Sequence, residues 1–112
     1  MKKRGEIWWV NFDPAIGQEI KKKRPAIIIS NNKSNKYLKR YQVVPCSSKT
    51  NKIYPSEAVI KINGQENKAM ADQIMTVSEI RFLNKIGKLS KEDIVEIERV
   101  VKFQIDIKDT EK

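Results

Sequence analysis

A basic loop between two predicted strands holds the side chains best suited to binding phosphate. It contains three consecutive lysines and an arginine, Lys21, Lys22, Lys23 and Arg24. Each lysine could neutralise a phosphate charge, and the planar guanidinium of Arg24 could hold two phosphate oxygens at once. Gln18 and a single carboxylate, Glu19, precede them. A solvated surface loop in which Glu19 pairs with a lysine accounts for these residues at least as well.

A pair of hydroxyl residues, Ser47 and Ser48, ends another predicted strand and is followed by Lys49. A hydroxyl there could donate to a phosphate oxygen or help to stabilise an oxyanion. The chain has no histidine, so a serine or cysteine nucleophile would lack its usual general base. Ser47 taken alone is more simply a turn residue. Cys46, the only cysteine, is predicted to be a small buried apolar side chain.

Polar and aromatic residues elsewhere could also contact a nucleic acid. Asp72 and Gln73 interrupt an apolar segment, so they either face solvent or are buried to hold neighbouring loops. Trp8 and Trp9 are adjacent on a predicted strand and therefore point to opposite faces. At most one of the two is expected to be exposed for stacking on a base.

The composition narrows the class of partner. The 112-residue chain carries 23 Lys and Arg against 14 Asp and Glu, a formal charge of +9. This balance favours a polyanion, nucleic acid before a membrane surface, although a lysine-rich proteome would give the same excess. One cysteine without histidine argues against zinc and excludes an intrachain disulfide. No apolar run approaches the roughly 18 residues of a membrane span. We therefore expect no metal, no cofactor, no membrane partner and a cytoplasmic location.

Segments rich in β-branched and aromatic residues predict five strands, at residues 6–12, 25–30, 41–46, 57–62 and 68–75. Alternation in the fourth sets Glu57 on the face opposite the apolar one, and residues 63–64 form a turn. The fifth is expected to bend at its polar centre. Residues 31–40 are predicted to be a polar loop, and a short helical turn is expected near Thr76. The pattern indicates a twisted, mostly antiparallel sheet.

One longer helix is predicted to begin after Ser90. The Ser90 hydroxyl can accept from the free N–H groups of the first turn, where carboxylates also suit the helix dipole. Apolar residues then recur at helical spacing and are expected to pack on the sheet: Ile94, Ile97, Val101 and Ile105. The charged tail at residues 108–112 is expected to fray.

The order of several segments is more specific than any one of them. The chain opens with RGEIWWVNFDP at residues 4–14, followed by Gly17-x-Glu19 and then RPAIIISN at residues 24–31. VPCSS at 44–48, YP at 54–55, ADQI-x-T at 71–76 and KIGKLS at 85–90 follow. In this order and spacing the segments resemble the MazF/PemK-type toxins of type II toxin–antitoxin systems. The resemblance covers nearly the whole chain, so residues 1–112 are expected to form a single toxin domain.

The resemblance implies a fold and an activity. The implied fold is mostly β, an SH3-like β-barrel of the CcdB/MazF/Kid plasmid maintenance toxin type, with a C-terminal α-helix and a homodimeric assembly. Family members cut single-stranded RNA, usually mRNA, at short sequences and without metal. The products carry a 2′,3′-cyclic phosphate and a 5′-hydroxyl. A cognate MazE/PemI-like antitoxin neutralises each toxin of the family.

Roles carry over residue by residue. The resemblance implies three catalytic residues: Arg24 binds the scissile phosphate, Ser47 hydrogen-bonds the same phosphate, and Glu19 matches a glutamate proposed as a base. RNA contacts are expected from seven further residues, Gln18, Lys21, Lys22, Lys23, Ser48, Lys49 and Gln73. One alternative is a non-catalytic toxin on this fold that poisons DNA gyrase by protein contact, which would not require Arg24 with Ser47. Another is an inactive nucleic-acid-binding domain.

Overall fold

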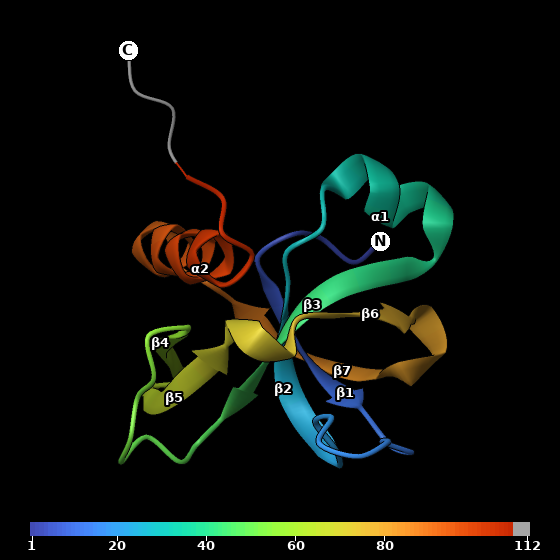
Figure 1. The fold of residues 1–112 in the computed structure, drawn as a ribbon. Helices are drawn as coiled ribbons and strands as arrows, with labels where there is room; N and C mark the ends of the chain where they lie inside the picture. The colour runs from blue at the N-terminus through green and yellow to red at the C-terminus, as the bar shows by residue number, and fades with distance from the viewer. Residues whose placement is uncertain (109–112) are drawn as a thin grey trace.

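Seven antiparallel strands form one strongly curved sheet in the computed structural model, which describes residues 1–108 (Figure 1). The strands are β1 (Glu6–Asn11), β2 (Lys23–Ile28), β3 (Arg40–Ser47), β4 (Glu57–Ile62), β5 (Gln65–Met70), β6 (Met75–Ser78) and β7 (Phe82–Lys88). Their order is β4-β5-β3-β2-β1-β7, with β6 paired to the first half of β3. The predicted mostly β, antiparallel architecture is confirmed. The predicted charged tail lies outside the described residues except for Lys108.

β2 lies at the centre of the sheet and is buried on both faces. Ile27 packs in one hydrophobic cluster with residues of β4, β5 and the C-terminal helix. Its neighbours Ala26 and Ile28 pack in a second cluster that includes Tyr41 and Phe82. An unbroken apolar run is typical of a strand that is covered on both sides. The strand begins at Lys23, before the predicted start at residue 25.

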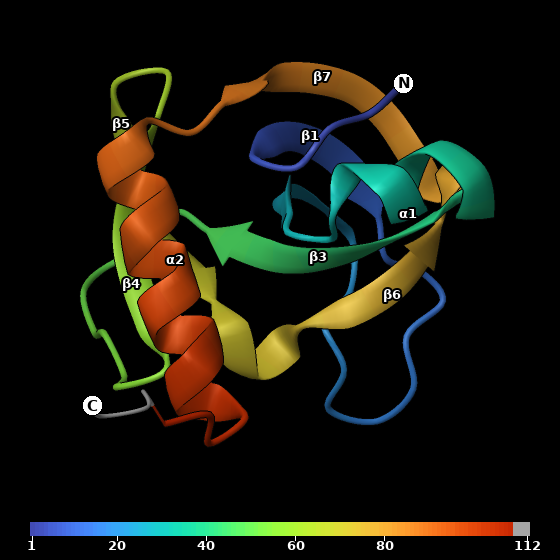
Figure 2. The same ribbon diagram turned by 90° about the horizontal axis from the view of Figure 1, so that it is seen from above.

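The C-terminal helix α2 (Lys91–Gln104) packs on β4 and on the 3-10 turn η1 (Ala71–Gln73) (Figure 2). As predicted, Ser90 caps it: the Ser90 hydroxyl accepts the N–H of Asp93 at 3.1 Å. Its inward stripe consists of Ile94, Ile97, Val100 and Val101. Ile105, predicted for this stripe, follows the last helical turn and is 51% exposed. No helix within residues 1–108 is both long and apolar enough to cross a membrane.

Residues 31–40 do not form the predicted loop, because Asn32–Leu38 form the helix α1. The side chain of Asn31 caps this helix by accepting the N–H of Ser34 at 2.8 Å. Asn35 is buried, and its amide donates to the carbonyl of Ser30 at 3.0 Å. Polar contacts rather than an apolar stripe hold α1, so hydrophobic periodicity could not predict it.

The predicted strand at residues 68–75 is broken, not bent. β5 ends at Met70, the 3-10 turn η1 (Ala71–Gln73) follows, and β6 begins at Met75. Before this turn β5 pairs with the end of β3, and after it β6 pairs with the first half of β3. The helical turn expected near Thr76 is η2 (Glu79–Arg81), which comes after β6. β7 was not predicted; it is largely exposed, and its register with β1 shifts twice, which disrupts the alternation of apolar residues.

Candidate active site

Arg24 and Ser47 come from neighbouring strands whose pairing brings them together. β2 and β3 run antiparallel, with Ala26 opposite Pro45. Continuing this register by two residues sets Arg24 opposite Ser47. The paired residues of β2 and β3 end at Pro45, however, and Cys46 and Ser47 pair only with β5, on the other edge of β3. β2 and β3 therefore separate at the end of β3, and Arg24 and Ser47 lie where they separate.

A cavity of about 400 Å³ opens at this separation, and both Arg24 and Ser47 line it. Lys23 and Ser48 line it beside them. Its remaining walls include apolar and amide side chains from β1, the β4–β5 hairpin and β7: Trp9, Ile62, Asn63, Gln65, Asn67 and Ile86. The lining thus combines cations and hydroxyls with uncharged apolar and amide groups.

The guanidinium of Arg24 is oriented by its own loop. Its Nε atom donates to the carbonyl of Lys21 at 3.0 Å. The loop itself is fixed to the end of β1, because the backbone of Lys22 accepts the N–H of Phe12 and donates to the carboxylate of Asp13, both at 2.9 Å. No carboxylate within residues 1–108 forms a salt bridge with Arg24. The two terminal amino groups are therefore free to bind an anion.

Ser47 is buried at the floor of the cavity, with 8% of its surface exposed. Its Oγ atom accepts the backbone N–H of Lys49 at 3.2 Å. That contact uses the hydroxyl as an acceptor, so its proton can be donated to a ligand. The Lys49 side chain is exposed and does not line the cavity.

A buried ion pair anchors the segment that follows Ser47. Lys68, opposite Ser47 on β5, contacts the carboxylate of Glu57 and the carbonyl of Lys52, both at 3.1 Å. The Glu57 carboxylate also accepts the N–H of Tyr54 at 2.9 Å. Glu57, predicted to lie on the strand face opposite the apolar residues, is only 8% exposed and pairs with Lys68. The alternation of apolar residues along a strand could not predict this ion pair, because its two members lie on different strands.

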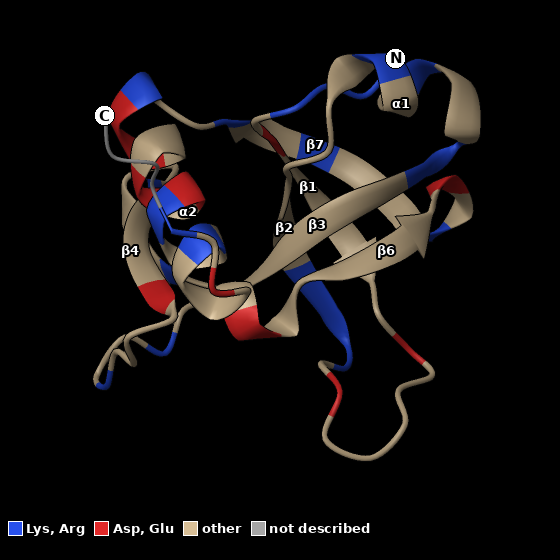
Figure 3. Cartoon of the chain, turned by 45° about the horizontal axis from the view of Figure 1, so that its top comes forward, with Lys and Arg blue, Asp and Glu red and all other residues tan. Residues whose placement is uncertain are grey.

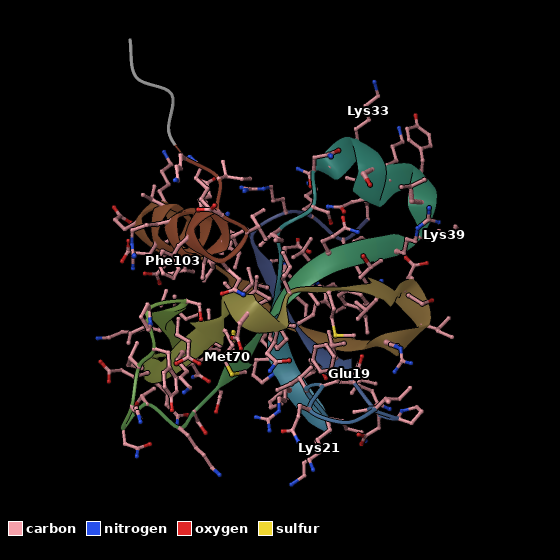
Figure 4. The ribbon with its side chains drawn as sticks, viewed as in Figure 1. Glu19, Lys21, Lys33, Lys39, Met70 and Phe103 are labelled. Carbon is pink, nitrogen blue, oxygen red and sulfur yellow. The ribbon has the colours of Figure 1, made fainter. Side chains whose placement is uncertain are left out.

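The structure does not bring Glu19 into the cavity. Its carboxylate accepts the N–H of Ile16 at 2.8 Å, so it folds back on its own loop. Figure 4 shows Glu19 and Lys21 in this loop, beyond the ends of β1 and β2. Gln73 lies in η1, which packs on α2. Five of the predicted RNA-contacting residues thus lie outside the cavity lining: Gln18, Lys21, Lys22, Lys49 and Gln73.

Cys46 is fully buried beneath the cavity, as predicted. Burial raises the pKa of its thiol far above the usual range, because the thiolate would lose its hydration. A thiol held in its protonated form is a poor nucleophile. Within residues 1–108, no three His, Cys, Asp or Glu side chains cluster so that they could hold a metal ion.

Similar proteins belong to one family of toxins. The family model for PemK-like, MazF-like toxins of type II toxin–antitoxin systems matches residues 3–105. The chain is 33% identical to endoribonuclease MazF9 of Mycobacterium tuberculosis, across 96% of this chain and 98% of that protein. It is 32% identical to the endoribonuclease toxin MazF of Escherichia coli K12, across 92% and 89%.

A solved structure has the same fold. It is an endoribonuclease in complex with its cognate antitoxin from a mycobacterial species, with a TM-score of 0.82 and 15% identity. The match covers 98% of this chain and 100% of that one. Sequence and fold together define a toxin of a type II toxin–antitoxin system. The chain belongs to the MazF/PemK family.

Proposed function

We propose that this chain is a sequence-specific endoribonuclease toxin that cleaves single-stranded RNA, including mRNA, without a metal ion. The observation that carries the proposal is the cavity shared by Arg24 and Ser47 on the fold of a MazF-type toxin. The relatives that match nearly the whole chain are named as endoribonucleases, which supports the same activity here. Cleavage of mRNA would stop translation and growth.

The substrate supplies its own nucleophile. The ribose 2′-oxygen forms a bond to phosphorus while the bond from phosphorus to the 5′-oxygen breaks. The 2′-hydroxyl loses one proton, and the departing 5′-oxygen gains one. The products are a 2′,3′-cyclic phosphate and a 5′-hydroxyl. A chain without histidine can promote this reaction, because it needs no nucleophile or acyl intermediate of its own.

The protein contributes orientation and charge. Negative charge builds up on the non-bridging phosphate oxygens in the transition state, where fixed donors are most effective. The two free amino groups of Arg24 bind these oxygens as a fork. Ser47 donates its hydroxyl proton to the same phosphate from the neighbouring strand end. Together they hold the backbone in the geometry that in-line attack requires.

The proposal includes partners. The active form is a cytoplasmic homodimer, and a cognate MazE/PemI-like antitoxin neutralises it. A structural relative bound to its own antitoxin supports such a partner. Lys23, at the mouth of the cavity, and the neighbouring Lys21 and Lys22 supply positive charge for the RNA backbone.

The test is cleavage of a long single-stranded RNA in excess chelator. We expect discrete cuts whose new 5′ ends accept phosphate directly from a polynucleotide kinase. Arg24→Ala should slow cutting roughly 10²- to 10³-fold, the usual cost of removing a transition-state donor. Arg40→Ala is the matched control, since it removes an exposed guanidinium at the opposite end of β3.

Three results would contradict the proposal. Wild-type protein that leaves all RNA intact is not an endoribonuclease and would favour a toxin that acts by protein contact. Activity that requires added divalent metal would contradict metal independence. Equal cutting by wild type and Arg24→Ala would remove Arg24 from the mechanism.

A further inference from the structure

Part of the cavity lining, here called the second wall, is not used by the phosphate chemistry. It consists of Trp9 from β1, Ile86 from β7 and the amides Asn63, Gln65 and Asn67 of the β4–β5 hairpin. None of these side chains carries a charge. A phosphate needs cations, whereas an aromatic face beside groups that both donate and accept hydrogen bonds suits a nucleobase.

The Trp8 side chain packs against other residues of the protein, whereas its neighbour Trp9 is partly exposed in the cavity. The Trp8 ring packs edge-on against Phe82 at 5.9 Å, and its indole N–H donates to Glu6 at 3.0 Å. Trp9 is 38% exposed and lines the cavity. It lies opposite Pro25, one residue from Arg24. An indole surface beside a phosphate-binding arginine is a platform on which a base can stack.

Asn67 supplies a fixed polar group in the same wall. It lies within β5, opposite Ile60, and is only 6% exposed. Its amide nitrogen donates to the carbonyl of Gln65 at 3.3 Å. Its side-chain oxygen accepts no hydrogen bond from residues 1–108 and is not sealed from solvent. A buried and oriented acceptor discriminates strongly, because a ligand without the matching donor leaves it unpaired.

We propose that this wall is a nucleobase-binding subsite. Trp9 stacks on the base of a nucleotide that adjoins the cleaved phosphate, and Asn67 accepts a hydrogen bond from the edge of that base. The inference rests on the proposed endoribonuclease function and names residues that select its cutting sites. The volume of about 400 Å³ lies within the range of small-ligand sites, so one base can be held beside the phosphate.

The test maps cutting sites on one long RNA of mixed sequence. Asn67→Asp keeps the size of the side chain but replaces the amide donor by a second acceptor. We expect it to change the base preferred at one position beside the cut, by at least tenfold in relative kcat/KM among sites. Asn84→Asp, which makes the same charge change on exposed β7, is the control and should keep the wild-type pattern.

Trp9 is tested by its effect on binding. Trp9→Ala should raise KM at least fivefold with little change in kcat, and Trp9→Phe should restore most of the loss because it keeps an aromatic face. Each variant is checked for cooperative unfolding. Should Asn67→Asp fail that check, Gln65→Glu at an exposed position of the same wall replaces it.

The outcomes separate the subsite from the activity. Wild-type protein that makes no cuts would contradict the endoribonuclease function itself. Cutting by Asn67→Asp and Trp9→Ala with the wild-type site pattern and KM would overturn only the nucleobase subsite. Loss of antitoxin binding without any change in cutting sites would assign the wall to a peptide and also overturn the proposal.

Discussion

At the scale of single residues, Arg24 and Ser47 each make one hydrogen bond to their own backbone surroundings. The guanidinium uses Nε on the carbonyl of Lys21, and the hydroxyl accepts from Lys49. Neither hydrogen bond occupies the groups that a phosphate needs, namely the terminal amino groups of Arg24 and the hydroxyl proton of Ser47. Both side chains are thus oriented before RNA binds, which is the condition for effective transition-state stabilisation.

Glu19 tests whether the mechanism needs a carboxylate base. Its carboxylate is bound to the N–H of Ile16 and would have to leave that position to reach the cavity. Glu19→Gln keeps an acceptor for Ile16 but cannot take a proton. We expect single-turnover cleavage to slow by less than tenfold, whereas removal of a working general base costs roughly 10²-fold or more. A loss of that size would show that the loop moves and that Glu19 is the base.

Glu6 makes the stability of the fold dependent on pH. Burial alone would raise the pKa of its carboxyl, but donors from the Lys3 backbone, the Trp8 indole and the Lys85 ammonium outweigh it and hold the pKa below the usual range. A lowered native pKa stabilises the fold above the unfolded pKa, and this stability is lost as pH falls through the native value.

Urea unfolding of wild type and Glu6→Gln at pH 7 and pH 3 measures this contribution. We expect the wild type to be more stable than the variant by about 1.5 kcal/mol at pH 7, and by much less at pH 3. A difference that stays the same at both pH values would mean that the carboxylate charge contributes nothing.

At the scale of elements, we expect the charge of the loop between β1 and β2 to bind the RNA backbone. Replacing Lys21, Lys22 and Lys23 with glutamine should weaken RNA binding and flatten its dependence on salt, by about 0.7 in slope for each phosphate that is no longer neutralised. The matched control replaces three other lysines with glutamine. Lys33 and Lys36 lie in α1, and Lys39 follows it. α1 lies across the sheet from the loop (Figures 1 and 4). An equal change in slope for both variants would mean that RNA does not follow the loop.

The pair of Lys68 and Glu57 holds β5 and the segment after Ser47 together. Lys68→Met would leave a buried carboxylate without its cation, so we expect unfolding free energy to fall by about 3 kcal/mol. Adding Glu57→Gln removes the charge but keeps an acceptor for the N–H of Tyr54, and should recover most of that loss. Equal destabilisation by the single and double variants would mean that packing, not the unpaired charge, sets the cost.

Several elements could be predicted from the sequence because their signals are local. β2 follows from an unbroken apolar run, α2 from the Ser90 cap and its stripe, and the β4–β5 hairpin from Asn63-Gly64. α1 has no apolar stripe, since the buried amide of Asn35 holds it instead. β7 could not be predicted because two register shifts interrupt its alternation.

At the scale of the whole molecule, the candidate site arises where the pairing of β3 with β2 ends and only β5 still pairs with β3. Residue types and family resemblance pointed to Arg24 and Ser47. They did not point to Asn67 or Lys68, which reach the site only through pairing between segments about twenty residues apart. The net charge of +9 could not locate the site either. Figure 3 shows Lys and Arg over both helices as well as at the start of β2.

We propose that Arg24 and Ser47 act as one unit on the same phosphate. The most direct measurement is single-turnover cleavage of one RNA, in excess chelator, by wild type, Arg24→Ala, Ser47→Ala and the double variant. We expect each single substitution to cost roughly 10²- to 10³-fold, and the double variant to be little slower than the slower single. Losses that multiply in the double variant would mean that the two residues act independently, and a wild-type rate in either single variant would contradict the shared site.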